Sequence, residues 1–519
     1  MPISTSQPPT TFSEMTNFSD LPVELTTKIL KQAWEASLTT EFKFPSADLL
    51  IVAGLKPSYK PILVESYAIP NPTGGTLFAF KAARVCSLWR DIVFTWSDGW
   101  DLVVFDLQDD PTPFLDVFTW SGDRIISVYI FNSKFESTPG LKELKIELYR
   151  VMTILRYLIP HVNRCQSIRF DVTFPSSLPP PVYFFVSGST TLGTLNLETF
   201  VPGEDPFKIP LSTTVSLFGP FPQLARLSLT GFAIMEMGWD FPGWIKALED
   251  GPRLHNLKLS NFMFSTENSD DAMDEPRQNT VRFFVSMLSR INPRRLHLVD
   301  MSLSSDSTPR NTPCGYNLAD ISIHFQTSSG PFLADFLSWT QGGIHESLKV
   351  TGCETTSPHF DAPLFGEMLT LHQMRNTSSI RAILANFRGA TLVLDSCAGF
   401  DDTLIEWLSQ SDGIEGAEGG TFAAKSMNHI RIKNCTDFTS DALRHLVAVR
   451  RRAAYRENEA VLPSTKVRNI DFLTVTGTAP VLEREDQVWF VMNPDVVEVC
   501  WYREELDGLT MHMFDNIED

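Results

Sequence analysis

Cysteine and histidine are the side chains of this sequence that could most readily bind a metal or attack a substrate, and their spacing limits both roles. The seven cysteines are Cys86, Cys165, Cys314, Cys353, Cys397, Cys435 and Cys500. Their number is odd, they are widely scattered and no C-x-x-C pair occurs, so neither a disulfide framework nor a zinc site of the usual spacing is predicted. The ten histidines lack metal-ligand spacing too. We expect reduced thiols, no metal and no cofactor.

The sequence carries no motif of a known catalytic centre. A P-loop, G-x-S-x-G, H-E-x-x-H and a dinucleotide-binding glycine fingerprint are all absent from it. Cys86 has no neighbouring base and lies on the apolar stripe of a predicted helix, which favours a buried thiol over a nucleophile. We predict that the protein is not an enzyme. The alternative is an enzyme with an unfamiliar site, which a deep pocket with shifted pKa values would indicate.

The net charge of the chain excludes two classes of partner. It is −19 with histidine neutral, and such a field repels nucleic-acid backbones and anionic membranes. No apolar run of about twenty residues could span a membrane, and the N-terminus lacks the features of a secretory signal. We expect a soluble protein of the cytoplasm, the nucleus or both. The basic run 450–452 is interpreted as the solvated end of a helix, with a localisation signal as the alternative.

Two amphipathic helices are predicted near the N-terminus. Residues 1–19 are rich in Ser, Thr and Pro and are predicted to be disordered. Apolar residues then recur every four positions and predict a helix over about 21–35, with a proline suited to its first turn. Residues 36–77 are mostly loop. A second helix is predicted over 81–96, where the apolar residues follow the spacing of one helical face.

From about residue 120 a short apolar-x-apolar signature returns again and again, followed by a turn residue. The signature predicts strands at 126–131, 166–171, 193–198, 225–232, 255–262, 294–301, 319–324, 346–353, 390–397, 428–435 and 471–477. Three of these segments end in a cysteine at the same place, at Cys353, Cys397 and Cys435. In the best two, 392–408 and 430–446, an amphipathic helix follows. Because such units cannot bury their faces alone, stacking would build one continuous core in which the cysteines pack.

These motifs resemble a known family. The segments LPVELTTKIL (21–30) and RVCSLWRDIV (84–93), followed by Trp100, resemble the F-box in the form abundant in mushroom-forming fungi. The cysteine-ended segments resemble the cysteine-containing leucine-rich repeats that often follow an F-box. The resemblance implies a small helical module at 20–105 with an insertion at 36–77. An irregular α/β leucine-rich-repeat solenoid at 120–480 and a C-terminal cap or tail at 481–519 would follow.

In that family the F-box docks on a Skp-type adaptor, which links it to a cullin-based ubiquitin ligase, and the repeats capture a protein substrate. Carried over by position, the adaptor-binding residues are Leu21, Pro22, Leu25, Ile29, Leu30, Val85, Cys86 and Trp89. Trp89 is the expected anchor because aromatic side chains carry much interface energy. The span from Leu21 to Trp100 is longer than an ordinary F-box. The alternative is therefore a repeat-based binding scaffold whose degenerate F-box recruits no adaptor.

The repeat strands also predict a basic surface. If the signature residues point inward, the residues between them point out of the sheet. In the last eight of these strands, the basic side chains at outward positions are Arg226, Lys258, Arg295, His297, His324, Lys349, His429, Arg431 and Lys433, against only Asp320 and Asp395 as the acidic ones. We hypothesise that this face holds acidic or phosphorylated substrate segments. The alternative is a chance pattern that carboxylates of the acidic loops neutralise.

Overall fold

The structure is a computed structural model of the chain. It describes residues 22–39, 78–83, 85–133, 140–185, 190–200, 221–264, 280–304, 315–318, 320–340, 345–355, 364, 366–410, 422–456, 467–493, 497–505 and 508–510. The segment 1–19, predicted to be disordered, and most of the predicted insertion therefore lie outside the described residues.

One parallel sheet runs through the described residues, and its fourteen strands follow one another in sequence order. They are β1 (Leu102–Asp106), β2 (Ile126–Phe131), β3 (Cys165–Val172), β4 (Thr194–Thr199), β5 (Arg226–Thr230), β6 (Asn256–Phe264), β7 (Arg295–Leu303), β8 (Ser322–Gln326), β9 (His345–Thr351), β10 (Gly366–His372), β11 (Thr391–Asp395), β12 (His429–Lys433), β13 (Phe472–Thr476) and β14 (Glu498–Trp501). A short antiparallel hairpin of β15 (Arg503–Glu505) and β16 (Gly508–Thr510) follows the sheet.

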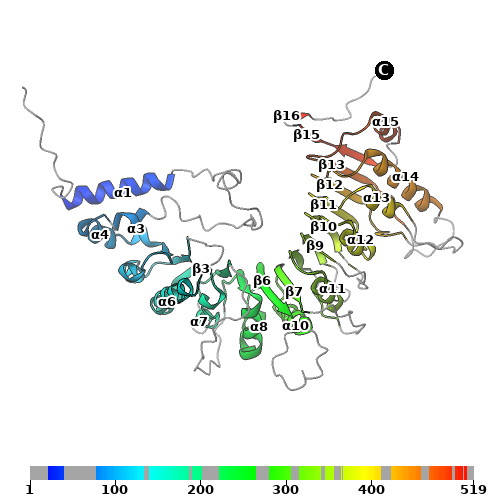
Figure 1. The fold of residues 1–519 in the computed structure, drawn as a ribbon. Coiled ribbons are helices and arrows are strands. Elements are labelled where there is room, and N and C mark those ends of the chain that lie inside the picture. Colours follow the sequence, from blue (N-terminus) through cyan, green and yellow to red (C-terminus); the bar gives the residue numbers. More distant parts are fainter. Residues whose placement is uncertain are drawn as a thin grey trace, which may run out of the picture.

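The first helices precede the sheet, and the later ones lie in connections between its strands, together on one side of it. The longer ones are α1 (Val23–Thr39), α3 (Phe78–Ala83), α4 (Ser87–Phe94), α6 (Leu141–Leu158), α8 (Gly231–Asp240), α9 (Pro242–Glu249), α10 (Val281–Ile291), α11 (Gly330–Trp339), α12 (Thr377–Ala385), α13 (Asp402–Ser409), α14 (Ser440–Arg456) and α15 (Arg484–Met492). Figure 1 shows an open arc with the strands along its inner edge and the helices along its outer edge. The predicted mixed α/β class is thereby confirmed.

Alternation along each strand explains why the sheet has one buried face. In β12, Ile430 and Ile432 are buried against the helices, whereas Arg431 and Lys433 are exposed on the inner face. Parallel strands need a crossover connection, and the helices described in these crossovers lie over the same face. Since neighbouring units bury each other's apolar residues, one hydrophobic cluster extends from Leu30 to Trp501.

A left-handed backbone residue recurs at the same position of eight successive strands. The positions are Asn261, Asp300, Thr327, Gly352, Gln373, Ser396, Asn434 and Gly477, all with positive φ. In the first seven of these strands the residue that follows is buried, whereas Thr478, which follows Gly477, is exposed. Cys353, Cys397 and Cys435 occupy that following position and are at most 2% exposed, as predicted. Burial raises the pKa of the Cys353 thiol to about 11, so it stays protonated.

The second predicted helix is wrong, because the segment 81–96 forms parts of two helices rather than one. The helix α3 ends at Ala83 and α4 begins at Ser87, with Cys86 between them in an extended conformation. Its Sγ accepts a hydrogen bond from the backbone N–H of Trp89 at 3.5 Å and so caps α4. The Cys86 thiol is therefore exposed and not buried as expected. The first helix also differs, since α1 extends to Thr39.

The sheet begins earlier and ends later than predicted. A 3₁₀ turn, η4 (Ser97–Trp100), leads directly from the helical module into β1, so the array starts near residue 102 rather than 120. Trp100 is fully buried, and its Nε1 donates to the carbonyl of Val93 at 2.9 Å. The strands β10 and β14 were missed as well, and the omission of β10 explains the longest predicted interval. Among the described residues, no helix combines the length and apolar character that crossing a membrane requires.

Candidate functional site

The N-terminal helices form a small layered module. One face of α1 packs against α3 and α4 through Thr26 and Leu30, which are 0% and 1% exposed. Further along the same face, the Trp34 ring meets Trp96 edge to face, with 5.0 Å between centroids. Buried alanines of α3 allow this close approach. Thus the core of the module uses only one of the apolar rows of α1.

A second apolar row of α1 remains exposed. Leu25 is 50% exposed and Ile29, one turn later, is 39% exposed. Val23, at the start of the helix, and Val85, in the turn before α4, are 52% and 61% exposed. We call these four residues the helical apolar surface. Large aliphatic side chains left on a surface in this way are typical of a site where a partner docks.

The residues predicted to bind the adaptor do not all lie on this surface. Leu25, Ile29 and Val85 belong to it, and Pro22 and Cys86 are exposed as well. Leu30 is instead part of the core, and Trp89 is half-buried against that core. Leu21 lies outside the described residues. The expected anchor, Trp89, therefore has only part of its ring available to a partner.

The inner face of the sheet is the second candidate surface, and its register aligns side chains from strand to strand. A middle row crosses it through Tyr129, Arg169, Asn196, Ser228, Lys258, His297, His324, Lys349, Thr370, Val393, Arg431 and Thr474. These include the predicted outward positions Lys258, Lys349 and Arg431. Arg226 and Arg295 are exposed in the row beside it, whereas Asp320 lies in the turn before β8.

In the first half of the inner face, β2 to β6, the basic side chains of the middle row are neutralised by carboxylates. Arg169 and Asp171 form an ion pair at 2.6 Å, and the Tyr129 hydroxyl donates to the same carboxylate at 2.8 Å. Burial, followed by the charge of Asp171, raises the pKa of Tyr129 well above its usual value. The guanidinium of Arg169 also lies over the Tyr129 ring, 5.1 Å from its centroid. This cluster presents no net charge to a partner.

Lys258 is neutralised in the same way, which corrects the prediction of a continuous basic face. Its Nζ lies 2.8 Å from Oε1 of Glu198, which also accepts from the Ser228 hydroxyl at 2.7 Å. Burial alone would raise the pKa of Glu198, but the Lys258 ammonium outweighs it and the pKa is lowered. Glu198 lies on β4, one strand before those whose outward charges were counted. The net charge of this face therefore depends on the charged side chains of neighbouring strands together.

The two central histidines are also not cations. The rings of His297 and His324 stack with centroids 4.3 Å apart and 1° between their planes. Their Nε2 atoms lie 2.9 Å from Gln326 Oε1 and Thr351 Oγ1, respectively. Burial, assisted by neighbouring lysines, lowers the pKa of His297 to about 4 and that of His324 to about 3. Both rings are neutral near pH 7 and offer hydrogen bonds rather than charge.

In the second half, β9 to β12, cations remain. Within the described residues, Lys349 and Lys433 have no ion pair. Arg431 is exposed, and its Nε donates to Nε2 of His429 at 3.2 Å. Burial and the Arg431 charge lower the pKa of His429, which keeps it an acceptor. We call Lys349, Arg431 and Lys433 the cationic strip.

Two polar features near the strip were not found from the sequence. Nδ1 of His372, on β10, is buried without a hydrogen-bond partner among the described residues. Arg450 contradicts the predicted solvated run, because it is 0% exposed and donates to the Ala424 carbonyl at 2.8 Å. The sequence pattern of charges does not reveal either feature, because the burial of His372 Nδ1 and of Arg450 depends on how the units pack together.

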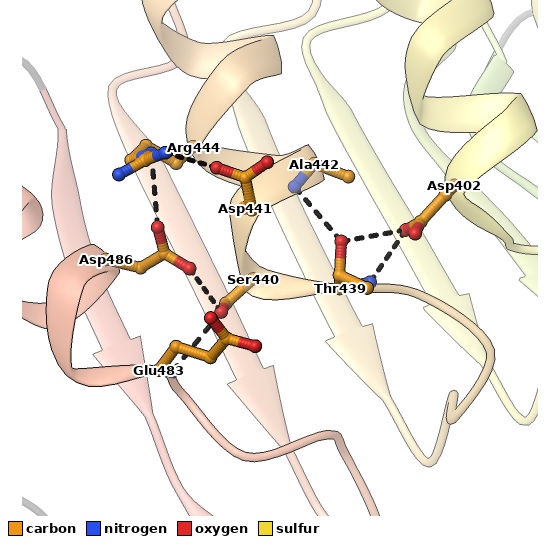
Figure 2. A network of polar contacts seen from close by, with 8 residues as sticks. All are labelled: Asp402, Thr439, Ser440, Asp441, Ala442, Arg444, Glu483 and Asp486. Atoms are coloured by element: carbon orange, nitrogen blue, oxygen red, sulfur yellow. Dashed lines mark hydrogen bonds and ion pairs between the residues drawn. The ribbon is translucent and has the colours of Figure 1, made fainter.

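A polar network on the helix side fixes the last units against each other (Figure 2). Asp486 of α15 is buried and lies 3.1 Å from Nε of Arg444, and it accepts from the Ser440 hydroxyl of α14. Asp402 of α13 accepts from the backbone N–H of Thr439 at 2.7 Å. Carboxylates thus join three successive helices behind β11, β12 and β13, so that the inner face above them is held in a defined register.

The described side chains form two candidate surfaces for binding. In the described part of the chain, no group of three or more His, Cys, Asp or Glu side chains could hold a metal ion. A scan against protein-family models found no match for this chain. A search of curated proteins found no similar protein either.

Proposed function

We propose that this chain is a non-enzymatic substrate-recognition subunit of a cullin-type ubiquitin ligase. In this proposal the N-terminal helices are an F-box that binds a Skp-type adaptor, and the parallel array is a leucine-rich-repeat solenoid that holds a protein substrate. The mechanism is proximity, because one end tethers the chain to the ligase while the other presents the substrate.

The observation that carries the proposal is the helical apolar surface. A module this small has little apolar material to spare, yet Leu25, Ile29 and Val85 stay exposed while Leu30 fills the core. Apolar helix faces that meet a partner's helices are a common mode of recognition. Leu25, Ile29, Val85, Pro22 and Cys86 are therefore the proposed adaptor contacts, and Leu30 is assigned a structural role.

The repeat identity rests on the recurrence along the array. The eight units from β6 to β13 each have a strand on the inner edge and a left-handed residue, and in seven of them a buried residue follows, which is cysteine in three. This recurrence agrees with stacked units of leucine-rich-repeat type, whose strands line a curved surface. The sequential strand order supports the same assignment.

The first experiment is co-purification of the full chain with a Skp-type adaptor. We expect a stable complex that a Leu25→Asp, Val85→Asp variant loses, because two charges would enter an apolar interface. The matched control is Leu141→Asp, Tyr149→Asp on α6, where both side chains are also exposed, at 69% and 71%. This control should keep the adaptor. Equal melting temperatures would show that all three proteins remain folded.

Failure of the unchanged chain to bind any Skp-type adaptor would contradict the ligase role. It would favour the scaffold alternative, in which the array binds partners without delivering them to a ligase. Loss of the complex in the α6 control as well would assign the effect to added charge rather than to the helical apolar surface.

A further inference from the structure

Along the middle row, the cations without an ion pair among the described residues lie at one end, on β9 and β12, whereas the exposed Arg226 and Arg295 lie in the row beside it. In β2 to β6 the basic side chains Arg169 and Lys258 have carboxylate partners within 2.8 Å. The histidines His297 and His324 at the centre are neutral near pH 7. The cationic strip on β9 and β12 therefore carries the attraction that an acidic partner would feel on the middle row.

The spacing of this strip defines a length. Lys349 pairs in register with Thr370, Thr370 with Val393, and Val393 with Arg431. Three strand spacings of about 4.8 Å separate Lys349 from Arg431, which gives about 14 Å. An extended peptide rises about 3.4 Å per residue, so side chains four residues apart are also about 14 Å apart. Positions i and i+4 of such a peptide point to the same side.

The side chains between Lys349 and Arg431 determine which residue a bound peptide can have between its two acidic positions. Thr370 and Val393 are half-buried neutral side chains in the middle row. They offer a small, mostly apolar contact to the residue at i+2. Beside Val393 on the same strand lies Asp395, which is opposite Lys433 in register. An acidic residue at i+2 would have no cation opposite it on the middle row, so a neutral residue is favoured there.

We propose that the inner face over β9 to β12 binds an extended segment of a partner protein that crosses the strands and carries Asp or Glu at positions i and i+4 around a neutral residue at i+2. One carboxylate meets Lys349, and the other meets Arg431 and Lys433. The hydroxyl of Thr370 lies on the path at its centre, and His372 lies in the next row, in register with Thr351 and Asp395. This inference deepens the proposed function, because it names the class of substrate that the array holds.

The test measures fluorescence anisotropy of labelled eleven-residue peptides with the full chain at low ionic strength. The parent peptide has Glu at i and i+4, Val at i+2 and Ser elsewhere. Three others move the second Glu to i+2, place a third Glu at i+2, or replace both Glu by Gln. We expect the parent peptide to bind at least about ten-fold more tightly than each of them, with affinity falling as salt is added.

The protein variants locate the site. Lys349→Glu, Arg431→Glu should weaken binding of the parent peptide at least about ten-fold, since attraction becomes repulsion at both positions. The matched control, Lys142→Glu, Arg156→Glu, makes the same change of net charge at exposed residues of α6 on the outer edge. It should leave the affinity within about two-fold. Equal weakening by both variants would overturn the proposal, because the net charge alone would then govern binding.

Two other outcomes also decide the matter. Equal affinity of the parent and the i,i+2 peptides would refute the spacing. A peptide with one phosphoserine in place of both Glu residues that binds more tightly than the parent would show that a single phosphate, not two spaced carboxylates, is the ligand. The Lys349→Glu, Arg431→Glu variant should still co-purify with the adaptor. Peptide binding without adaptor binding would overturn the ligase role and keep this site.

Discussion

The two halves of the inner face use similar side chains in opposite ways. In β2 to β6, Arg169 and Lys258 are held by Asp171 and Glu198 within the sheet. In β9 to β12, Lys349 and Lys433 have no ion pair among the described residues, although Asp395 lies beside Lys433 in register. The difference shows that charges on outward positions are structural where a neighbouring strand supplies the counter-ion. They are available for recognition where it does not.

The largest effect on stability is expected where the paired half is broken. Glu198→Ala would leave the Lys258 ammonium, whose side chain is only 20% exposed, without its carboxylate. The Ser228 hydroxyl would also lose its acceptor. We expect the free energy of unfolding to fall by about 2 kcal/mol, measured as a lower urea midpoint. Glu198→Gln, which keeps the acceptor for Ser228, should cost less. An unchanged midpoint for Glu198→Ala would erase the distinction between the halves.

A smaller effect is expected from pH at the boundary between the halves. His297 and His324 have folded pKa values of about 4 and about 3, below their usual 6.5. The unfolded chain therefore binds more protons below pH 6.5, and stability should fall as the pH drops from 6.5 toward 4. Replacing both rings, as in His297→Gln, His324→Gln, should remove at least about 1 kcal/mol of this fall. The measurement is the urea midpoint at several pH values.

The matched control for that pH series is His445→Gln, since His445 is exposed on α14 away from the inner face. Its pH profile should follow that of the unchanged chain. If the stability of the double variant fell as steeply as that of the unchanged chain, the two rings would have to be charged in the folded state. The central part of the inner face would then belong to the cationic half.

The smallest effect on stability is expected from the unpaired half. Lys349→Ala and Lys433→Ala remove cations that have no ion pair in the described structure. The free energy of unfolding, measured by urea denaturation, should therefore change by less than about 0.5 kcal/mol. A loss as large as that of Glu198→Ala would show that these lysines also hold the sheet together. The cationic strip would then be a structural feature rather than a surface for a partner.

Local patterns were enough to predict most strands and the place of the repeated cysteines. The apolar-x-apolar signature found β12 and its neighbours because alternation follows directly from the geometry of a strand. It missed β1 and β14, which lie outside the range where the pattern is repetitive, and β10, which lies in a polar interval. The helical periodicity of 81–96 predicted one helix where the structure has α3 and α4, because this periodicity does not show that Cys86 adopts an extended conformation.

The candidate surfaces were predictable only in part. Leu25 and Ile29 belong to the apolar row that the resemblance assigns to a partner, and they are exposed. Leu30 and Trp89 belong to the same motifs, but packing in the module buries one fully and the other partly. The spacing of residues on a helix fixes which of them share a face. It does not fix which face meets the neighbouring helices.

The sequence by itself determined the outward and buried rows of the strands that its pattern predicts, because these follow from the period of two in a strand. Only the tertiary structure decided which outward charges meet a partner. Glu198 reaches Lys258 across sixty positions of sequence, and stacking buries His297 and His324 against each other. Both effects depend on register between strands, and register is set by the packing of whole units rather than by any one of them.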